Sequence, residues 1–148
     1  MRKPYTRLPL PEISPINNAS TIALPYLSVR LGAKAGQRTP RFDAIVDSGS
    51  PWCLFRADIA KLLKIDLSTG ILDEVAGVDG LPMKTYFHKI KIYVENDWVI
   101  EVLAGFVEGL QVNGLLGRNG FFDNFHVHFD HTDRENPPLE VRRIDRPN

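Results

Sequence analysis

Apolar and polar residues alternate with a period of two over several separate stretches of the chain. In the first stretch, Leu27, Val29 and Leu31 are separated by Ser28 and Arg30, a spacing that puts the apolar residues on one face of a strand. The same alternation recurs around residues 90–94 and 125–129, and the run 41–47 ends in consecutive apolar positions. Residues 98–107 are mostly apolar, which is typical of a strand buried on both faces. The pattern therefore predicts strands along most of the chain.

Only two stretches favour a helix. Between positions 56 and 65, Ile59, Leu62 and Leu63 fall at i, i+3 and i+4, which gives one apolar face, and lysines are available for the opposite face. A second short helix is expected within 119–125. Six or seven short strands with one or two short helices predict a mainly β domain.

The two ends of the chain differ from its centre. Residues 1–20 are rich in proline and polar side chains, so we expect an irregular N-terminal arm there. Residues 21–131 carry the strand pattern and form the predicted domain. Residues 132–148 form a charged C-terminal tail, in which 139–144 can return as a strand beside 125–129.

Composition narrows the class of protein. A chain of 148 residues with 43% hydrophobic residues is enough for one domain and one core. Basic and acidic residues number 18 each without like-charge blocks, which argues against nucleic acid or an anionic membrane as a partner. The single cysteine excludes an internal disulfide, and no window approaches the roughly 20 apolar residues of a membrane span. We expect a soluble, cytoplasmic protein with no cofactor and no metal.

The candidate chemistry lies where the predicted strand 41–47 ends. Asp47 would hold its carboxylate at a rigid, poorly solvated strand end, and the Ser48 hydroxyl can hydrogen-bond across the site. Gly49 lets the backbone turn and leaves room for a second body to approach. Taken alone, Asp-Ser-Gly is an ordinary turn sequence, so its surroundings decide the interpretation.

Those surroundings resemble the retropepsin-like aspartic proteases. The run 44–50 is similar to their motif of apolar residues, Asp, Ser or Thr, Gly, and Ala or Ser. About seventy positions further on stands their second signature, two apolar residues and Gly continued by Arg; it consists here of Leu115, Leu116, Gly117 and Arg118. Between the two motifs, a glycine-rich stretch resembles the family's flap; its residues are Val75, Ala76, Gly77, Val78, Asp79 and Gly80. The likeness covers about 26–130, most of the chain.

The resemblance implies an acid-protease barrel with one lobe per chain and an aspartic endopeptidase activity. That chemistry needs two carboxylates sharing a proton, and the chain has one Asp-Ser-Gly, so the resemblance implies a C2 homodimer with two Asp47 copies facing each other. A water between them would attack an extended polypeptide held under the flap. By the same resemblance, Ser48 orients the carboxylates, Gly117 is structural, and Arg118 braces the dimer interface through an ion pair.

Two other interpretations stay open. The chain can be a non-catalytic dimerisation or peptide-binding module on the same fold. It can also be a metal-binding β domain, because His126 and His128 lie two positions apart on one face of a predicted strand. The simpler interpretation is that these histidines lie on the solvent-exposed face of a strand whose other face is apolar.

Overall fold

The computed structural model describes residues 1–34, 36–77, 79–95 and 98–145. The protein is mainly β, with 50% of the described residues in strands and 6% in helices, as the sequence pattern predicts. It divides into two compact units. One unit is residues 27–124, and the other combines residues 1–26 with residues 125–148.

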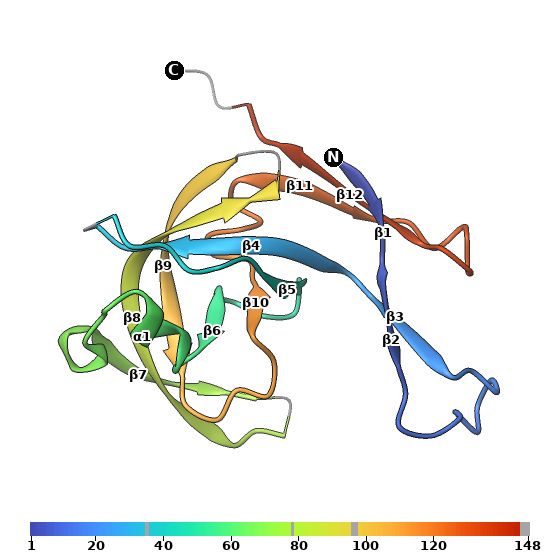
Figure 1. The fold of residues 1–148 in the computed structure, drawn as a ribbon, viewed down its shortest axis with the longest axis horizontal. Coiled ribbons are helices and arrows are strands. Elements are labelled where there is room, and N and C mark those ends of the chain that lie inside the picture. Colours follow the sequence, from blue (N-terminus) through green and yellow to red (C-terminus); the bar gives the residue numbers. More distant parts are fainter. Residues whose placement is uncertain (35, 78, 96–97, 146–148) are drawn as a thin grey trace. The chain divides into compact units, whose positions relative to one another are not determined.

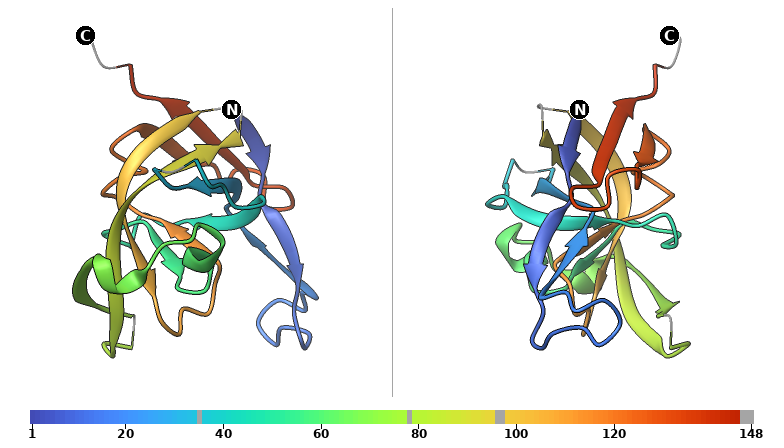
Figure 2. Two further views of the ribbon diagram at one scale, coloured as in Figure 1. Left: turned by 60° about the vertical axis from the view of Figure 1, so that its left-hand side comes forward. Right: turned by 90° about the vertical axis from the view of Figure 1, so that its right-hand side faces the viewer.

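Six strands close into a barrel, which can be followed from three sides in Figures 1 and 2. Neighbouring strands run in the order β4, β5, β10, β6, β9 and β8, and β8 pairs back with β4. Their bounds are Tyr26–Gly32 for β4, Phe42–Val46 for β5, Leu54–Arg56 for β6, Pro82–Val94 for β8, Val99–Val107 for β9 and Gly114–Leu116 for β10. The pairings of β5 with β10 and of β6 with β9 are parallel.

The alternating apolar residues of β4 fill the barrel. Leu27, Val29 and Leu31 are fully buried, and the register sets Val29 opposite Val94 and Leu31 opposite Ile92 of β8. Burial of such a side chain contributes roughly 1.5–3 kcal/mol, which explains why the period-two pattern is so clear in the sequence. The strand predicted here is confirmed.

Strand β8 is thirteen residues long and changes the side on which it is buried. Thr85 and Phe87 are buried on one face, whereas Ile90 and Ile92 are buried on the other. The register with β9 runs without a break from Thr85 to Tyr93, so no bulge causes the change. The two halves of the strand instead pack in two different apolar surroundings.

Strand β7 (Ile71–Ala76) pairs with β8 and extends the barrel sheet by one strand. Ile71 and Leu72 are 64% and 57% exposed, and almost all of β7 faces solvent. A strand whose two faces are both exposed to solvent has no alternation of apolar and polar residues. The sequence of this region therefore shows glycines but no strand pattern.

The predicted helix at 56–65 is much shorter in the structure, where α1 covers Ile59–Leu62. Lys64 adopts a φ of 53°, the left-handed conformation that commonly ends helices. The amide of Ile65 then donates to the carbonyl of Ala60, which closes this end. A short 3₁₀ helix, η1 (Leu67–Thr69), follows, with the Asp66 side chain accepting from the Ser68 amide.

The helix expected within 119–125 was a wrong prediction. The chain makes a hydrogen-bonded turn there, in which the amides of Phe121 and Phe122 both donate to the carbonyl of Gly117. Gly120, at a φ of 112°, interrupts the helical backbone, because that angle lies far from the helical region.

The second unit contains two small sheets. Strands β1 (Arg2–Pro4), β12 (Pro138–Arg143) and β11 (Phe125–Phe129) form one in that order, and β2 (Thr6–Pro9) pairs with β3 (Thr21–Leu24) in the other. The antiparallel pairing of β11 with β12 confirms the strand pair predicted near the C-terminus. Two strands stand where an irregular arm was expected; Pro4 and Pro9 end them, and a strand end tolerates proline.

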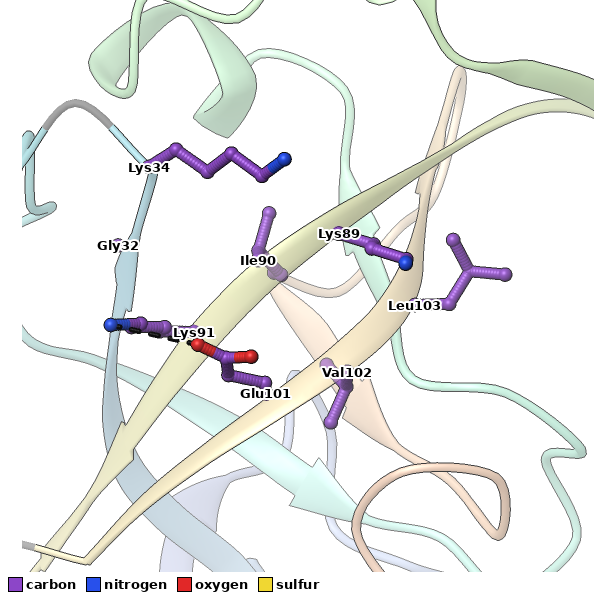
Figure 3. Close-up of a pocket in the computed structure, with 8 residues that line it drawn as sticks. All are labelled: Gly32, Lys34, Lys89, Ile90, Lys91, Glu101, Val102 and Leu103. Atoms are coloured by element: carbon purple, nitrogen blue, oxygen red, sulfur yellow. Dashed lines mark ion pairs between the residues drawn. The ribbon is translucent and has the colours of Figure 1, made fainter.

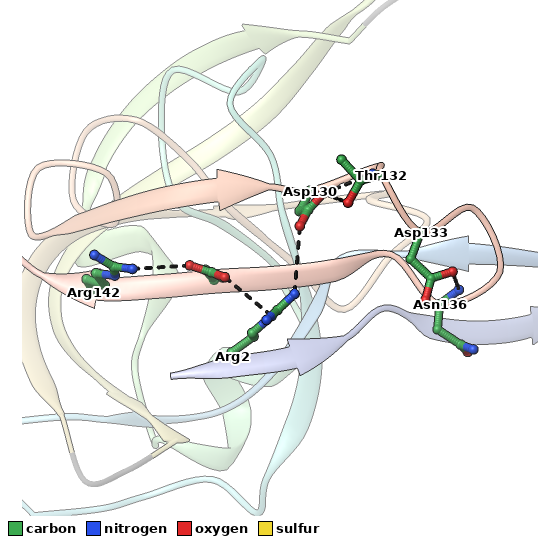
Figure 4. Close-up of polar contacts among 7 residues, drawn as sticks. Arg2, Asp130, Thr132, Asp133, Asn136 and Arg142 are labelled. Atoms are coloured by element: carbon green, nitrogen blue, oxygen red, sulfur yellow. Dashed lines mark hydrogen bonds and ion pairs between the residues drawn. The ribbon is translucent and has the colours of Figure 1, made fainter.

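Polar contacts join the three-stranded sheet (Figure 4). The Arg2 guanidinium lies 3.7 Å from Asp130 and 3.3 Å from Glu140, and Arg142 lies 3.4 Å from Glu140. Hydrogen bonds from Thr132 hold the pKa of Asp130 below its ordinary value, and the nearby charges of His128 and Arg2 contribute less. Across the described ranges, no helix is long and apolar enough to cross a membrane.

Candidate active site

Asp47 follows the last residue of β5 and is half-buried. Its backbone amide donates to the carbonyl of Leu116, with 3.1 Å between the nitrogen and the oxygen. Leu116 is the last residue of β10, which runs parallel to β5 with Val46 opposite Leu116. The barrel therefore fixes the backbone of Asp47 directly.

The next three residues make a tight turn around the Asp47 carboxylate. The Gly49 amide donates to Asp47 Oδ1 at 2.9 Å, and the Ser50 amide donates to the Asp47 carbonyl at 3.3 Å. Among the described residues, only the Gly49 amide donates to the Asp47 carboxylate, through Oδ1. Ser48 and Gly49 are exposed, which leaves the turn open to an approaching molecule.

Arg118, in the second signature, holds this turn by two hydrogen bonds. Its backbone amide donates to the carbonyl of Ser50 at 2.9 Å, and its Nη1 donates to the carbonyl of Ser48 at 3.0 Å. The resemblance implies an ion pair for this arginine, but Arg118 forms none with the part of the chain that the structure describes. Within one chain, Arg118 positions the Asp47 turn, and its role at a dimer interface stays a prediction.

Gly117 is required by the close passage of two chain segments. A Cβ at this position would overlap the carbonyl of Trp52 and lie 2.7 Å from the oxygen of Ser50. Next to it, the amide and the side chain of Asn119 both donate to the carbonyl of Pro51, at 2.9 Å and 2.7 Å. The second signature therefore lies against the segment that follows Asp47.

Cys53 lies beside this crossing and is fully buried. Its Sγ donates to the carbonyl of Gly117 at 3.9 Å. Burial raises the pKa of the thiol to about 11. At neutral pH the thiol stays protonated, so Cys53 contributes packing and no nucleophile.

The predicted flap is a hairpin made by β7, β8 and the turn between them. Val75 and Ala76 end β7, opposite Met83 and Pro82. In the turn, the Leu81 amide donates to Asp79 Oδ1 at 3.0 Å, so Asp79 stabilises the turn through its own side chain.

Two glycines contribute a hydrogen bond and a left-handed backbone conformation to this turn. The Gly80 amide donates to the carbonyl of Gly77 at 2.9 Å, and Gly80 has a φ of 74°. A left-handed backbone of this kind strongly favours glycine. Val78, also predicted in the flap, lies outside the described residues.

One apolar cluster joins the two motifs to the hairpin. Its buried members are Leu54, Phe87 and Val107. Half-buried side chains pack around them from the segment after Asp47, from the second signature and from the hairpin; they are Trp52, Val75, Met83, Leu103, Leu110 and Leu115. We call this set the outer cluster. It brings together parts of the chain that the sequence assigned to one site.

Trp52 is the residue of this cluster that the sequence reasoning missed as a site residue. Its ring packs edge-on against Phe87, with 5.3 Å between the ring centroids. It is half-buried and stands five positions after Asp47. That short separation from the Asp-Ser-Gly motif was the available signal, because a residue so close must lie near the same strand end.

The two histidines of β11 do not form a recognisable metal site. His126 and His128 are both exposed, and the register sets them opposite Arg142 and Glu140 of β12. Among the described residues, no three His, Cys, Asp or Glu side chains lie close enough together to hold a metal ion. Both histidines line a surface pocket together with Glu140, and the metal-binding alternative stays a prediction.

Comparison with known proteins adds no family to this picture. No protein-family model matches the chain, and no curated protein matches it. The interpretation of the site depends on its residues and their geometry.

Proposed function

We propose that the chain is an aspartic endopeptidase that acts as a C2 homodimer and hydrolyses peptide bonds with a water held between two Asp47 copies. One observation carries this proposal. The carboxylate at the end of β5 accepts from the Gly49 amide at 2.9 Å, while the segment around Gly117 and Arg118 holds the same turn from a distant part of the chain. An ordinary surface Asp-Ser-Gly turn needs no such support.

The chemistry follows from a pair of carboxylates that share one proton. Two like charges at hydrogen-bonding distance do not both ionise easily, so the pair keeps one proton between them. The ionised copy of Asp47 accepts a proton from the water as the water attacks the scissile carbonyl. The protonated copy donates to the carbonyl oxygen, and no covalent intermediate forms.

The homodimer supplies what one chain lacks. No hydrogen bond or ion pair joins Asp47 to another ionisable side chain of the described residues. A two-fold axis sets a residue near the axis opposite its own copy, so one Asp47 per chain gives two carboxylates per site. The exposure of Ser48 and Gly49 leaves the turn open to the partner copy.

The proposed substrate is an extended polypeptide. The β7–β8 hairpin is the flap that covers it, excludes water and pairs with its backbone. Trp52 and Leu115 of the outer cluster are half-buried. Their exposed parts offer apolar surface to a side chain of the substrate. A preference for apolar residues near the cleaved bond follows from that surface.

The proposed location is the cytoplasm. The single cysteine, Cys53, is buried and unpaired, and a chain without disulfides suits a reducing compartment.

The decisive experiment is digestion of a diverse peptide library by the wild type and by Asp47→Asn, from acid to neutral pH, with products read by mass spectrometry. The wild type should cleave, with an optimum on the acid side, and Asp47→Asn should not, while sedimentation velocity shows both as dimers. Asp43→Asn is the matched control, because Asp43 is an exposed carboxylate of the same strand. It should cleave like the wild type.

Two results would contradict the proposal. Cleavage by Asp47→Asn at the wild-type rate would exclude Asp47 as the catalytic group. A wild-type dimer that binds peptides but cleaves none would instead establish the peptide-binding module on the same fold.

A further inference from the structure

Strand β8 pairs with β9 along one of its edges, and along its other edge it pairs first with β7 and then with β4. A short gap separates these last two pairings in the described structure. The pairing with β4 ends where Gly32 lies opposite Lys91, and the pairing with β7 begins where Ile71 lies opposite Phe87. No strand of the described part of the chain pairs with residues 88–90 on this side. We call this gap the seam of the barrel. Two cavities open at it, with volumes of about 290 and 330 Å³.

Three lysine side chains line each cavity, and the second cavity is also lined by Gln37, Asp66, Thr69 and His88. Lys34 and Lys89 line both of them, Lys91 lines the first and Lys64 lines the second. Figure 3 shows Lys34 reaching from the end of β4 toward β8, while Lys91 turns to Glu101. The two cavities therefore adjoin and share their positive charge.

The carboxylates at the seam are already engaged. Glu101 lies 3.6 Å from Lys91, and Asp66 Oδ1 accepts from the amide and the hydroxyl of Ser68, at 3.0 and 2.7 Å. Lys34, Lys64 and Lys89 form no ion pair with the residues that the structure describes. Like charges that line one space repel each other, and a bound multivalent anion removes that repulsion.

Lys64 stands at the end of α1 in an unusual backbone conformation. This residue has a φ of 53° at the end of α1, a position where glycine is the usual choice. A side chain in this conformation costs on the order of 1 kcal/mol. Lys64 is also one of the residues that line the second cavity.

We propose that the seam binds a compact ligand carrying two or more phosphate groups. Lysine ammonium groups bind phosphate as point charges, and several of them around one space suit an anion with more than one charged group. Among the described residues, no arginine lines either cavity. Ile90, Val102 and Leu103 supply apolar surface for the rest of the ligand. The site shares no residue with the Asp47 turn, so it stands apart from the proteolytic proposal.

Calorimetric titration of the full chain with inorganic tripolyphosphate tests this site. The wild type should show saturable binding to one site that weakens as salt rises, because salt screens the attraction. Lys34→Gln and Lys89→Gln should each weaken binding about tenfold, the effect of losing one charge-assisted hydrogen bond. Lys61→Gln is the matched control, since Lys61 is an exposed lysine of α1 outside both cavities. It should bind like the wild type.

Several outcomes would overturn the proposal. Binding that is unchanged in Lys34→Gln and Lys89→Gln would place the anion elsewhere, provided that circular dichroism shows both variants folded. Equal weakening in Lys61→Gln would show a diffuse charge effect. Binding of a single-stranded oligonucleotide or of polyglutamate, but not of tripolyphosphate, would replace the compact ligand by a macromolecule. Asp47→Asn should bind tripolyphosphate normally, so the two proposals fail independently.

Discussion

The backbone amide of Asp47 donates to the carbonyl of Leu116, with 3.1 Å between nitrogen and oxygen. This bond continues the parallel pairing of β5 with β10 by one step, into the turn that carries the carboxylate. The two motifs are far apart in the sequence and form one structural unit in space. Changes in the second motif should therefore alter the first.

Replacing Gly117 by alanine tests this unit through stability. The added Cβ would overlap the carbonyl of Trp52, and backbone cannot move aside as a flexible side chain can. We expect Gly117→Ala to lower the free energy of unfolding by about 3 kcal/mol or more, in the range of large core defects. Urea denaturation followed by fluorescence measures it.

The control for this variant is Gly109→Ala. Gly109 has a φ of 82°, and no atom lies within 4 Å of its Cβ position, so only backbone strain is added, about 1 kcal/mol. Equal losses for the two variants would show that the crossing at Gly117 is not tight.

Arg118 should act on catalysis more than on stability. Its Nη1 bond to the Ser48 carbonyl is exposed, so Arg118→Ala should cost about 1 kcal/mol or less of unfolding free energy. The looser turn misplaces the Asp47 carboxylate, so kcat should fall while KM changes little. Arg41→Ala is the matched control, because Arg41 is also an exposed arginine that donates to a backbone carbonyl, that of Ser28. A parallel loss of kcat in Arg41→Ala would remove the special role of Arg118.

Mixed dimers test whether the site is shared between two chains. If each site needs two Asp47 copies, a wild-type chain paired with an Asp47→Asn chain is inactive. Activity should then fall with the square of the wild-type fraction after the two proteins are unfolded and refolded together. Activity that falls only in proportion to the wild-type fraction would mean that one chain suffices.

Stability should fall as pH rises above the ordinary pKa of the Cys53 thiol. Burial raises the pKa in the folded state from 9.0 to about 11, so the unfolded chain loses this proton first. The contribution is complete below pH 9 and is lost between pH 9 and 11. It amounts to roughly 2–3 kcal/mol. Cys53→Ala should lack this component of the pH slope, which urea midpoints across that range reveal.

The strands were predictable where one of their faces is buried. Leu27, Val29 and Leu31 alternate because every second side chain enters the core, and the pattern survives in the sequence. Strand β7 left no such trace, because both of its faces meet solvent. The length of α1 depended on the left-handed Lys64, a residue type that gives no warning of this conformation.

The sequence predicted which two motifs form the candidate site, but it did not predict how they are arranged in space. The sequence indicates Asp47 to Gly49 and the segment around Gly117, but not the contacts between them. The resemblance does not imply the bond from Arg118 to the Ser48 carbonyl, and no local pattern encodes a side chain reaching a distant carbonyl. The contact of Trp52 with Phe87 was likewise not predictable, because only folding brings these two residues together.

The bond from Arg118 to Ser48 spans 70 positions of sequence. Closing so long a loop costs chain entropy before any contact can compensate, so non-local pairings of this kind form slowly. The geometry around Asp47 should therefore appear late in folding, after the local hairpins. A nascent or partly unfolded chain holds the residues of the proposed protease without its turn, and so would carry no proteolytic activity before folding is complete.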